Sequence, residues 1–224
     1  MPGYGMALAQ AQKLVKQLAD QLEQQGKEVK FAIHPVAGRM PGHMNVLLCE
    51  ADVPYEQLYE MDAIDDEFKE CDVAVVVGAN DVVNPAANTA EGTPIYGMPV
   101  LSVDQAKHVI ICNYDLKPGY AGVENPLYHK PGVSLLLGDA QVTLQSLLTS
   151  IGNGNGLQTV RFVAAKGERN IDRGKAVHRV ADLLRRGTAF FPAGCGRLCG
   201  FILRNSGGYC IGSRFAVDAG APTP

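Results

Sequence analysis

Val73-Ala74-Val75-Val76-Val77, five consecutive apolar residues, leads directly into Gly78-Ala79-Asn80-Asp81. A continuous apolar strand of this kind is typical of a parallel sheet that is covered on both faces. Two further runs of the same kind are Val109 to Cys112 and Ser134 to Leu137. The sequence therefore predicts a doubly wound, mostly parallel α/β sheet, whose ligand lies at the carboxyl ends of its strands.

Helical and extended segments alternate through the rest of residues 1–151. Apolar residues at three-and-four spacing predict an amphipathic helix over Ala7 to Gln25, and Gly26 fits its C-terminal stop. The remaining expected elements are strands over Val29 to Ile33 and Val53 to Glu60, helices over Pro41 to Ala51 and Gln141 to Thr149, and a short helix or loop over Met61 to Glu70.

Four glycine-centred turns lie where hydrophobic runs stop. They are Gly3-Tyr4-Gly5, Val36-Ala37-Gly38-Arg39, Gly78-Ala79-Asn80-Asp81 and Gly119-Tyr120-Ala121-Gly122. Glycine lets backbone N–H groups come close to a phosphate, and an arginine in such a loop can pair with one. Together the turns predict a dinucleotide site at the carboxyl edge of the sheet.

Charge and cysteine content limit the partners of the chain. Residues 1–150 carry 9 Lys and Arg against 19 Asp and Glu, whereas residues 151–224 carry 11 against 4. The acidic part argues against nucleic acid or an anionic membrane as its partner, and no apolar run approaches the roughly 18 residues of a membrane-spanning helix. Cys49, Cys71 and Cys112 lack metal-ligand spacing, so we expect reduced structural thiols, no metal site and a cytoplasmic protein.

On these four turns, residues 2 to about 151 resemble the NADP(H)-binding third domain, in the beta subunit, of proton-translocating nicotinamide nucleotide transhydrogenase. The resemblance implies a Rossmann-like fold and NADP(H) as cofactor. It also implies an NAD(H)-binding domain or alpha subunit and a membrane domain as partners, at the cytoplasmic face of the inner membrane. Family members have a strand before the first glycine turn, but only Met1 and Pro2 precede Gly3, so we expect the sheet to lack its first strand.

The resemblance also assigns roles to individual residues. It implies that Arg39 contacts the phosphates, that Asn80 and Asp81 lie at the nicotinamide, and that Asp81 responds to the redox state. The segment 119–126 resembles a lid that folds over the nucleotide. The implied cofactor-binding residues are Gly3, Tyr4, Gly5, Val36, Ala37, Gly38, Arg39, Gly78, Ala79, Asn80, Asp81, Asn113, Tyr114, Asp115, Gly119, Tyr120, Ala121, Gly122, Gly138, Asp139 and Ala140.

Structural alternatives stay open at several of these positions. Gly3 to Gly5 can be a flexible tail, and Asp81 and Asp139 can cap the turn or helix that follows each of them. His34 and His43 are explained as well by loop or capping roles as by ligand contacts, so neither is expected to act as an acid or base.

One segment departs from the family pattern. Asn113-Tyr114-Asp115 stands where the family usually has Lys-Arg-Ser, whose cations hold the 2′-phosphate that distinguishes NADP from NAD. A carboxylate beside a ribose favours a free 2′-hydroxyl over a 2′-phosphate. The preference between NADP and NAD is therefore open.

Residues 152–224 have a different composition, and here the resemblance ends. Gly152 to Gly156 reads as a linker, Lys175 to Arg186 as a candidate basic helix, and the rest as an Arg- and Gly-rich extension. The spacing of Cys195, Cys199 and Cys210 does not favour a zinc site. We interpret this segment as a disordered or non-native extension in preference to a functional module.

Two functions remain for the whole chain. The first is a component of an enzyme that transfers a hydride directly between NADH and NADP+, coupled to proton translocation. Such transfer depends on the juxtaposition of two nicotinamide rings, so no side-chain nucleophile is expected. The alternative is a truncated or vestigial nucleotide-binding fragment without independent catalysis.

Overall fold

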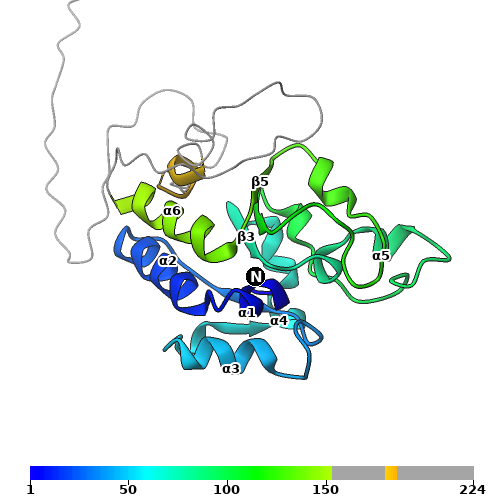
Figure 1. Ribbon diagram of the computed structural model, residues 1–224, viewed down its shortest axis with the longest axis horizontal. Helices are drawn as coiled ribbons and strands as arrows, with labels where there is room; N and C mark the ends of the chain where they lie inside the picture. The colour runs from blue at the N-terminus through cyan, green and yellow to red at the C-terminus, as the bar shows by residue number, and fades with distance from the viewer. Residues whose placement is uncertain (153–179, 186–224) are drawn as a thin grey trace, which may run out of the picture. The chain divides into compact units, whose positions relative to one another are not determined.

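The computed structural model describes residues 1–152 and 180–185 (Figure 1). All of these residues belong to one compact unit. The proposed linker, zinc-site cysteines and basic extension lie outside the described residues, except for Gly152 and the helical residues 180–185. The boundary at residue 151 stays a prediction.

The five strands of the described residues all pair in parallel, as the sequence predicted. β3 (Val73–Val77), β4 (His108–Asn113) and β5 (Val133–Leu137) form one sheet in that order. β1 (Phe31–Ile33) and β2 (Leu58–Glu60) form a second, two-stranded sheet. The three apolar runs that predicted strands thus form a single sheet.

The two sheets contribute alternate residues to the same two hydrophobic cores. Phe31 and Ile33 of β1 lie in one core with Val77 of β3, whereas Ala32 lies in the other with Val76. Since successive strand residues point to opposite faces, the two sheets form one layer that is covered on both sides. This arrangement confirms the predicted doubly wound class.

The start of the chain lies beside β3, on the edge opposite β4. Pro2 forms an isolated parallel bridge with Val77. The Met1 nitrogen donates to the Val75 carbonyl at 2.9 Å, and the N–H groups of Val77 and Gly3 donate to Met1 and Val77 carbonyls at 2.9 Å each. Among the described residues, no strand joins β1 to β3.

Helices cover the layer on both faces and connect its strands (Figure 1). The α-helices are α1 (Tyr4–Leu8), α2 (Gln12–Gln24), α3 (His43–Glu50), α4 (Met61–Ile64), α5 (Ala86–Thr89) and α6 (Ala140–Gly152). The 3-10 turns are η1 (Tyr55–Gln57), η2 (Asp65–Lys69), η3 (Asp81–Val83), η4 (Val103–Gln105) and η5 (Pro126–His129). In the described part of the chain, no helix is long and apolar enough to span a membrane.

The predicted single helix from Ala7 to Gln25 is wrong at its beginning. The chain forms two helices, α1 and α2, and Gln10 between them has a φ of +50°. Leu8, which the periodicity placed on the buried face, is 68% exposed because it belongs to α1 and not to α2. The turn arises because α1 begins at the first glycine turn, whose position is set by contacts with β3.

The predicted end of that helix is confirmed. Gly26 has a φ of +77°, and its N–H donates to Glu23 while the Lys27 N–H donates to Leu22. This is the Schellman pattern, in which glycine takes the left-handed position after a helix.

Other boundaries also differ from the prediction. The expected strand from Val53 to Glu60 is extended only from Leu58, because η1 follows Pro54. The expected helix from Pro41 begins at His43, because Gly42 before it has a φ of +72°. The pattern of apolar residues does not indicate the η1 turn, so the sequence placed the start of the strand too early.

Candidate functional site

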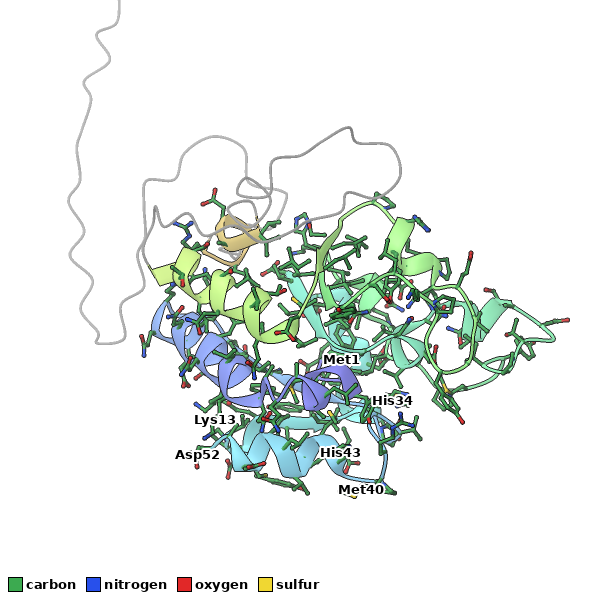
Figure 2. The ribbon with its side chains drawn as sticks, in the orientation of Figure 1. Met1, Lys13, His34, Met40, His43 and Asp52 are labelled. Atoms are coloured by element: carbon green, nitrogen blue, oxygen red, sulfur yellow. The ribbon has the colours of Figure 1, made fainter. Side chains whose placement is uncertain are left out.

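The predicted site residues lie on loops that leave the carboxyl ends of β1, β3, β4 and β5, together with the first glycine turn. Parallel strands bring these ends to the same edge of the layer. Figure 2 labels His34 and Met40 on the loop after β1, His43 at the start of α3 and Asp52 at the far end of α3.

The first glycine turn packs directly on the third. Gly3 donates to the Val77 carbonyl at 2.9 Å and Gly5 to the Gly78 carbonyl at 2.8 Å. Gly78 has a φ of +67°, and a Cβ atom there would lie 2.5 Å from the Gly5 Cα. These glycines are therefore required for backbone-to-backbone contact, a role that the sequence analysis did not predict.

Arg39 lies over the ring of Tyr4. The guanidinium carbon is 4.3 Å from the ring centroid, a cation–π contact that joins the loop after β1 to the first glycine turn. Arg39 is itself exposed to solvent. The two segments that were predicted to hold phosphate thus meet in space, with the cation at the surface.

His43 stabilises the loop of Arg39 through a hydrogen bond to its backbone. Its Nδ1 accepts a hydrogen bond from the Arg39 backbone N–H at 3.2 Å. Gly38 has a φ of +107°, and a Cβ atom there would lie 2.5 Å from that same nitrogen. His43 therefore has the structural role that the sequence left open, and only glycine fits at position 38.

His34 is buried, with 2% of its surface exposed. Nδ1 accepts a hydrogen bond from the Val36 N–H at 3.2 Å, and Nε2 lies 2.8 Å from the Pro99 carbonyl oxygen. Since a carbonyl only accepts, Nε2 carries the proton. Burial lowers the pKa of His34, and the bond to Pro99 opposes this shift.

Asp81 contacts the segment that was predicted to be a lid. Oδ2 accepts a hydrogen bond from the Ala121 N–H at 3.0 Å, and a Cβ atom on Gly119 would lie 2.7 Å from the Asp81 Cγ. No side chain caps η3, so Asp81 does not have the capping role that the sequence left open. Oδ1 of Asp81 is buried without a hydrogen-bond partner in the described residues.

Asparagine side chains tie the loops after β3 and β4 together. Asn80 donates to the Lys117 carbonyl at 3.0 Å, and Asn125 donates to the Asn80 Oδ1 at 3.0 Å. Asn84 donates to the Glu124 carbonyl at 3.2 Å. Residues 117–125 are therefore held against residues 80–84 at several points along their length.

The segment that departs from the family pattern is divided between interior and surface. Asn113 is 9% exposed, and its Nδ2 donates to the Ala79 carbonyl at 2.9 Å and to the Tyr128 hydroxyl at 3.0 Å. Burial raises the pKa of Tyr128 to about 12, so its hydroxyl stays protonated. Tyr114, in contrast, is 78% exposed. The Asn113 side chain thus serves an internal contact.

Asp115 pairs with the nearest cation of its own loop. Its Oδ2 lies 3.6 Å from the Lys117 Nζ, and its Oδ1 accepts from the Lys117 N–H at 3.1 Å. The Lys117 side chain is 84% exposed. One negative and one positive charge therefore stand together at this strand end.

At the end of β5, Asp139 caps α6. Oδ1 accepts hydrogen bonds from the N–H groups of Gln141 and Val142, at 2.9 and 3.2 Å. The structure thus supports the capping role for Asp139 that the sequence left open. A contact from Gly138, Asp139 or Ala140 to a ligand stays a prediction, as does one from Tyr120, which is 96% exposed.

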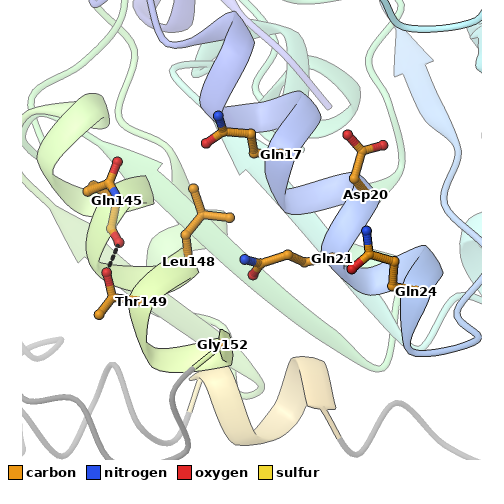
Figure 3. Close-up of a pocket in the computed structure, with 8 residues that line it drawn as sticks. All are labelled: Gln17, Asp20, Gln21, Gln24, Gln145, Leu148, Thr149 and Gly152. Carbon is orange, nitrogen blue, oxygen red and sulfur yellow. Dashed lines mark hydrogen bonds between the residues drawn. The ribbon is translucent and has the colours of Figure 1, made fainter.

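A groove of about 470 Å³ lies between α2 and α6 (Figure 3). It is lined by Gln17, Asp20, Gln21, Gln24, Gln145, Leu148, Thr149 and Gly152. No predicted site residue lines this groove, so it is separate from the edge where the loops meet.

The structure also identifies residues of the site that sequence analysis missed. These are Asn84, Pro99, Asn125 and Tyr128, which link one loop to another. Asn125 lies within the predicted lid, residues 119–126, but the sequence assigned no contact to its side chain. Nothing in the sequence pattern marks Pro99.

Parallel strands with loops that meet at one arginine-bearing edge define a Rossmann-like α/β protein. Residues 1–150 match the model of the NAD(P) transhydrogenase beta subunit family, and the chain belongs to this family. Two sequences named NAD(P) transhydrogenase subunit beta, both from Rhodospirillum rubrum, are 51% identical to it over 151 residues. The alignments cover 67% of this chain and 32% of each relative, so the chain spans about a third of their length. The family resemblance seen in the sequence is confirmed.

Proposed function

We propose that this chain is the NADP(H)-binding component of a nicotinamide nucleotide transhydrogenase. Hydride passes directly between NADH on a partner domain and NADP+ on this chain, and in the complete enzyme this transfer is coupled to proton translocation. The partners are an NAD(H)-binding domain or alpha subunit and a membrane domain. Family membership and 51% identity to the beta subunits support the proposal, since the family binds NADP(H) as substrate.

The contact between Arg39 and Tyr4 carries this proposal. It brings a cation to the edge where the strand-end loops meet, and the contact with the ring restrains the position of the guanidinium. A planar guanidinium forms two parallel hydrogen bonds with a phosphate, which favours a nucleotide over an uncharged ligand. We assign Arg39 to the phosphate groups, with Gly3, Gly5 and Gly38 shaping the backbone around it.

The buried Oδ1 of Asp81 marks the other end of the proposed site. A buried acceptor without a partner costs about 1–3 kcal/mol, and a ligand N–H donor removes this cost. The carboxamide of a nicotinamide carries such a donor. We propose that Asp81, oriented with Asn80, contacts the nicotinamide and relays its redox state to Ala121 in the lid.

The proposed lid is the segment 119–126. Gly119 and Gly122 flank Tyr120 and Ala121, which suits a hinged segment, and Tyr120 is 96% exposed. We propose that closure over the nucleotide turns Tyr120 toward it. Contacts of this kind exclude water from the transferred hydride.

Recognition of the 2′-phosphate is the most distinctive part of the proposal. Asn113 faces the interior, so Tyr114, Asp115 and Lys117 are the residues of this strand end that a ribose would meet. We propose that a 2′-phosphate recruits Lys117 away from Asp115. NAD(H) would instead leave this ion pair intact.

Calorimetric titration of the full chain with NADP+, NADPH, NAD+ and NADH tests the function. We expect binding of the NADP pair, and we expect Arg39→Gln to weaken it roughly 10- to 100-fold, the effect of a lost charged hydrogen bond. Lys69→Gln is the control, because Lys69 pairs with Asp66 in η2, before the amino end of β3. Binding of NAD(H) alone would reverse the cofactor assignment, and binding of none would refute the function.

Reconstitution with an NAD(H)-binding partner domain separates the two functions. Hydride transfer between the bound nucleotides is expected for the transhydrogenase component. Tight binding of NADP(H) without transfer would support the alternative, a nucleotide-binding fragment without catalysis.

A further inference from the structure

We propose that His34 is a positioning residue of the nucleotide site, which fixes the loop of Arg39 by joining it to the chain at Pro99. The proposal rests on the nucleotide-binding function proposed above. It differs from a ligand contact, because the His34 side chain is 2% exposed and both ring nitrogens are engaged within the protein.

The first bond of His34 shapes the loop. Its Nδ1 accepts from the Val36 N–H at 3.2 Å, two residues further along the chain. In an Asx turn, an Asn or Asp side chain accepts a hydrogen bond from the backbone N–H of residue i+2. Here the ring nitrogen of His34 takes the place of that side-chain oxygen. The bond sets the direction in which residues 35–39 leave β1, and therefore the position from which Arg39 reaches Tyr4.

The second bond anchors the loop to a distant segment. His34 Nε2 donates to the Pro99 carbonyl at 2.8 Å, across 65 positions of sequence. Met98 and Val100, on either side of Pro99, pack on a small hydrophobic cluster of Ala86, Ala87 and Ile95. Ala121 and Val123 of the lid region pack on the same cluster. His34 thus lies between the Arg39 loop and the segment against which the lid rests.

Only a neutral imidazole of one tautomer satisfies both bonds. It must accept at Nδ1 and donate at Nε2. Asparagine places an oxygen near the Nδ1 position and retains the turn but not the anchor, and alanine retains neither bond. The two substitutions therefore separate the local bond from the long-range one.

The expected effect follows from preorganisation. A loop that is ordered before binding loses less conformational entropy when the ligand arrives. We expect His34→Ala to raise the Kd for NADPH about tenfold, the upper range for loss of a neutral hydrogen bond. His34→Asn retains the turn, so we expect a Kd between those of the wild type and His34→Ala.

The experiment measures the Kd of the full chain for NADPH and NADH, with each variant alone and in an Arg39→Gln background. If His34 acts through Arg39, His34→Ala has no further effect once the guanidinium is gone. The control is His108→Ala, since His108 is exposed at the amino end of β4. Titrations are made at a temperature at which circular dichroism shows every variant folded.

Amide hydrogen exchange without nucleotide gives a second readout. The Val36 N–H is expected to be protected in the wild type and in His34→Asn, and to exchange faster in His34→Ala. This readout tests the local bond even if His34→Ala is too unstable for titration, because a Val36 N–H that is unprotected in the wild type would show that the bond does not form.

The outcomes distinguish this proposal from the one on which it rests. If the wild type binds nucleotide and Arg39→Gln weakens binding, but the loss caused by His34→Ala is unchanged in the Arg39→Gln background, the role of His34 is refuted and the function stands. If the wild type binds none of the nucleotides, both proposals fail. An unprotected Val36 N–H in the wild type would also overturn the positioning role.

Discussion

Substitution of Gly78 by alanine is expected to destabilise the fold more than substitution of a left-handed glycine whose added Cβ meets no neighbouring atom. Gly78 has a φ of +67°, and its added Cβ would lie 2.5 Å from both the Cα and the carbonyl carbon of Gly5. The left-handed conformation costs alanine about 1–2 kcal/mol. Relief of the clash requires a backbone shift, which costs about 1–3 kcal/mol more. The total is roughly 2–5 kcal/mol.

Gly92 provides the matched control for this prediction. Its φ is +81°, but no atom lies within 4 Å of an added Cβ. Alanine at position 92 is therefore expected to lower the free energy of unfolding only by the conformational term of about 1–2 kcal/mol. The difference between Gly78→Ala and Gly92→Ala therefore isolates the contact of the first glycine turn with the end of β3.

Thermal and denaturant unfolding of the full chain measure both variants. For a chain of this size, 1 kcal/mol shifts the Tm by about 2–4 °C, so Gly78→Ala is expected to lower it by roughly 4–20 °C. Gly92→Ala is expected to lower it by roughly 2–8 °C. Equal losses for the two variants would show that the backbone contact contributes nothing and would refute the reasoning.

Three further predictions concern single contacts. Asp139→Ala removes the N-cap of α6 and should lower the free energy of unfolding by about 1 kcal/mol in denaturant titrations; an unchanged midpoint would contradict the cap. Gly119→Ala should displace the Asp81 carboxylate and speed amide exchange at Ala121. Unchanged exchange would show that the chain relieves the clash without breaking the hydrogen bond between Ala121 and Asp81. Burial lowers the pKa of His34 below its ordinary 6.5 in the folded chain. As the pH falls, His34 is therefore protonated at a higher pH in the unfolded chain than in the folded chain. The free energy of unfolding should therefore fall as the pH drops below 6.5, and level off below the lowered pKa. The corresponding His34→Asn variant should lack this decline, and parallel wild-type and variant profiles would refute it.

Local patterns predicted the elements whose signal is contained within a few residues. β3 was predicted correctly because a continuous apolar run needs no information from elsewhere in the chain. The stop at Gly26 was predicted correctly because a left-handed residue after a helix favours glycine. The helix from Ala7 was wrong because the break at Gln10 follows from packing of the first glycine turn on Gly78, which no local pattern reports.

In the candidate site, too, some features follow from local sequence and others only from tertiary packing. The sequence by itself determined the parallel α/β class, the family, and which loops reach the carboxyl edge, because apolar runs and glycine turns express local backbone requirements. The tertiary structure alone decided that Arg39 lies over Tyr4, that Asp81 holds Ala121 and that Asn113 faces the interior. Each of these contacts joins residues 34 to 40 positions apart, and such pairing depends on where the strands place their loops in space.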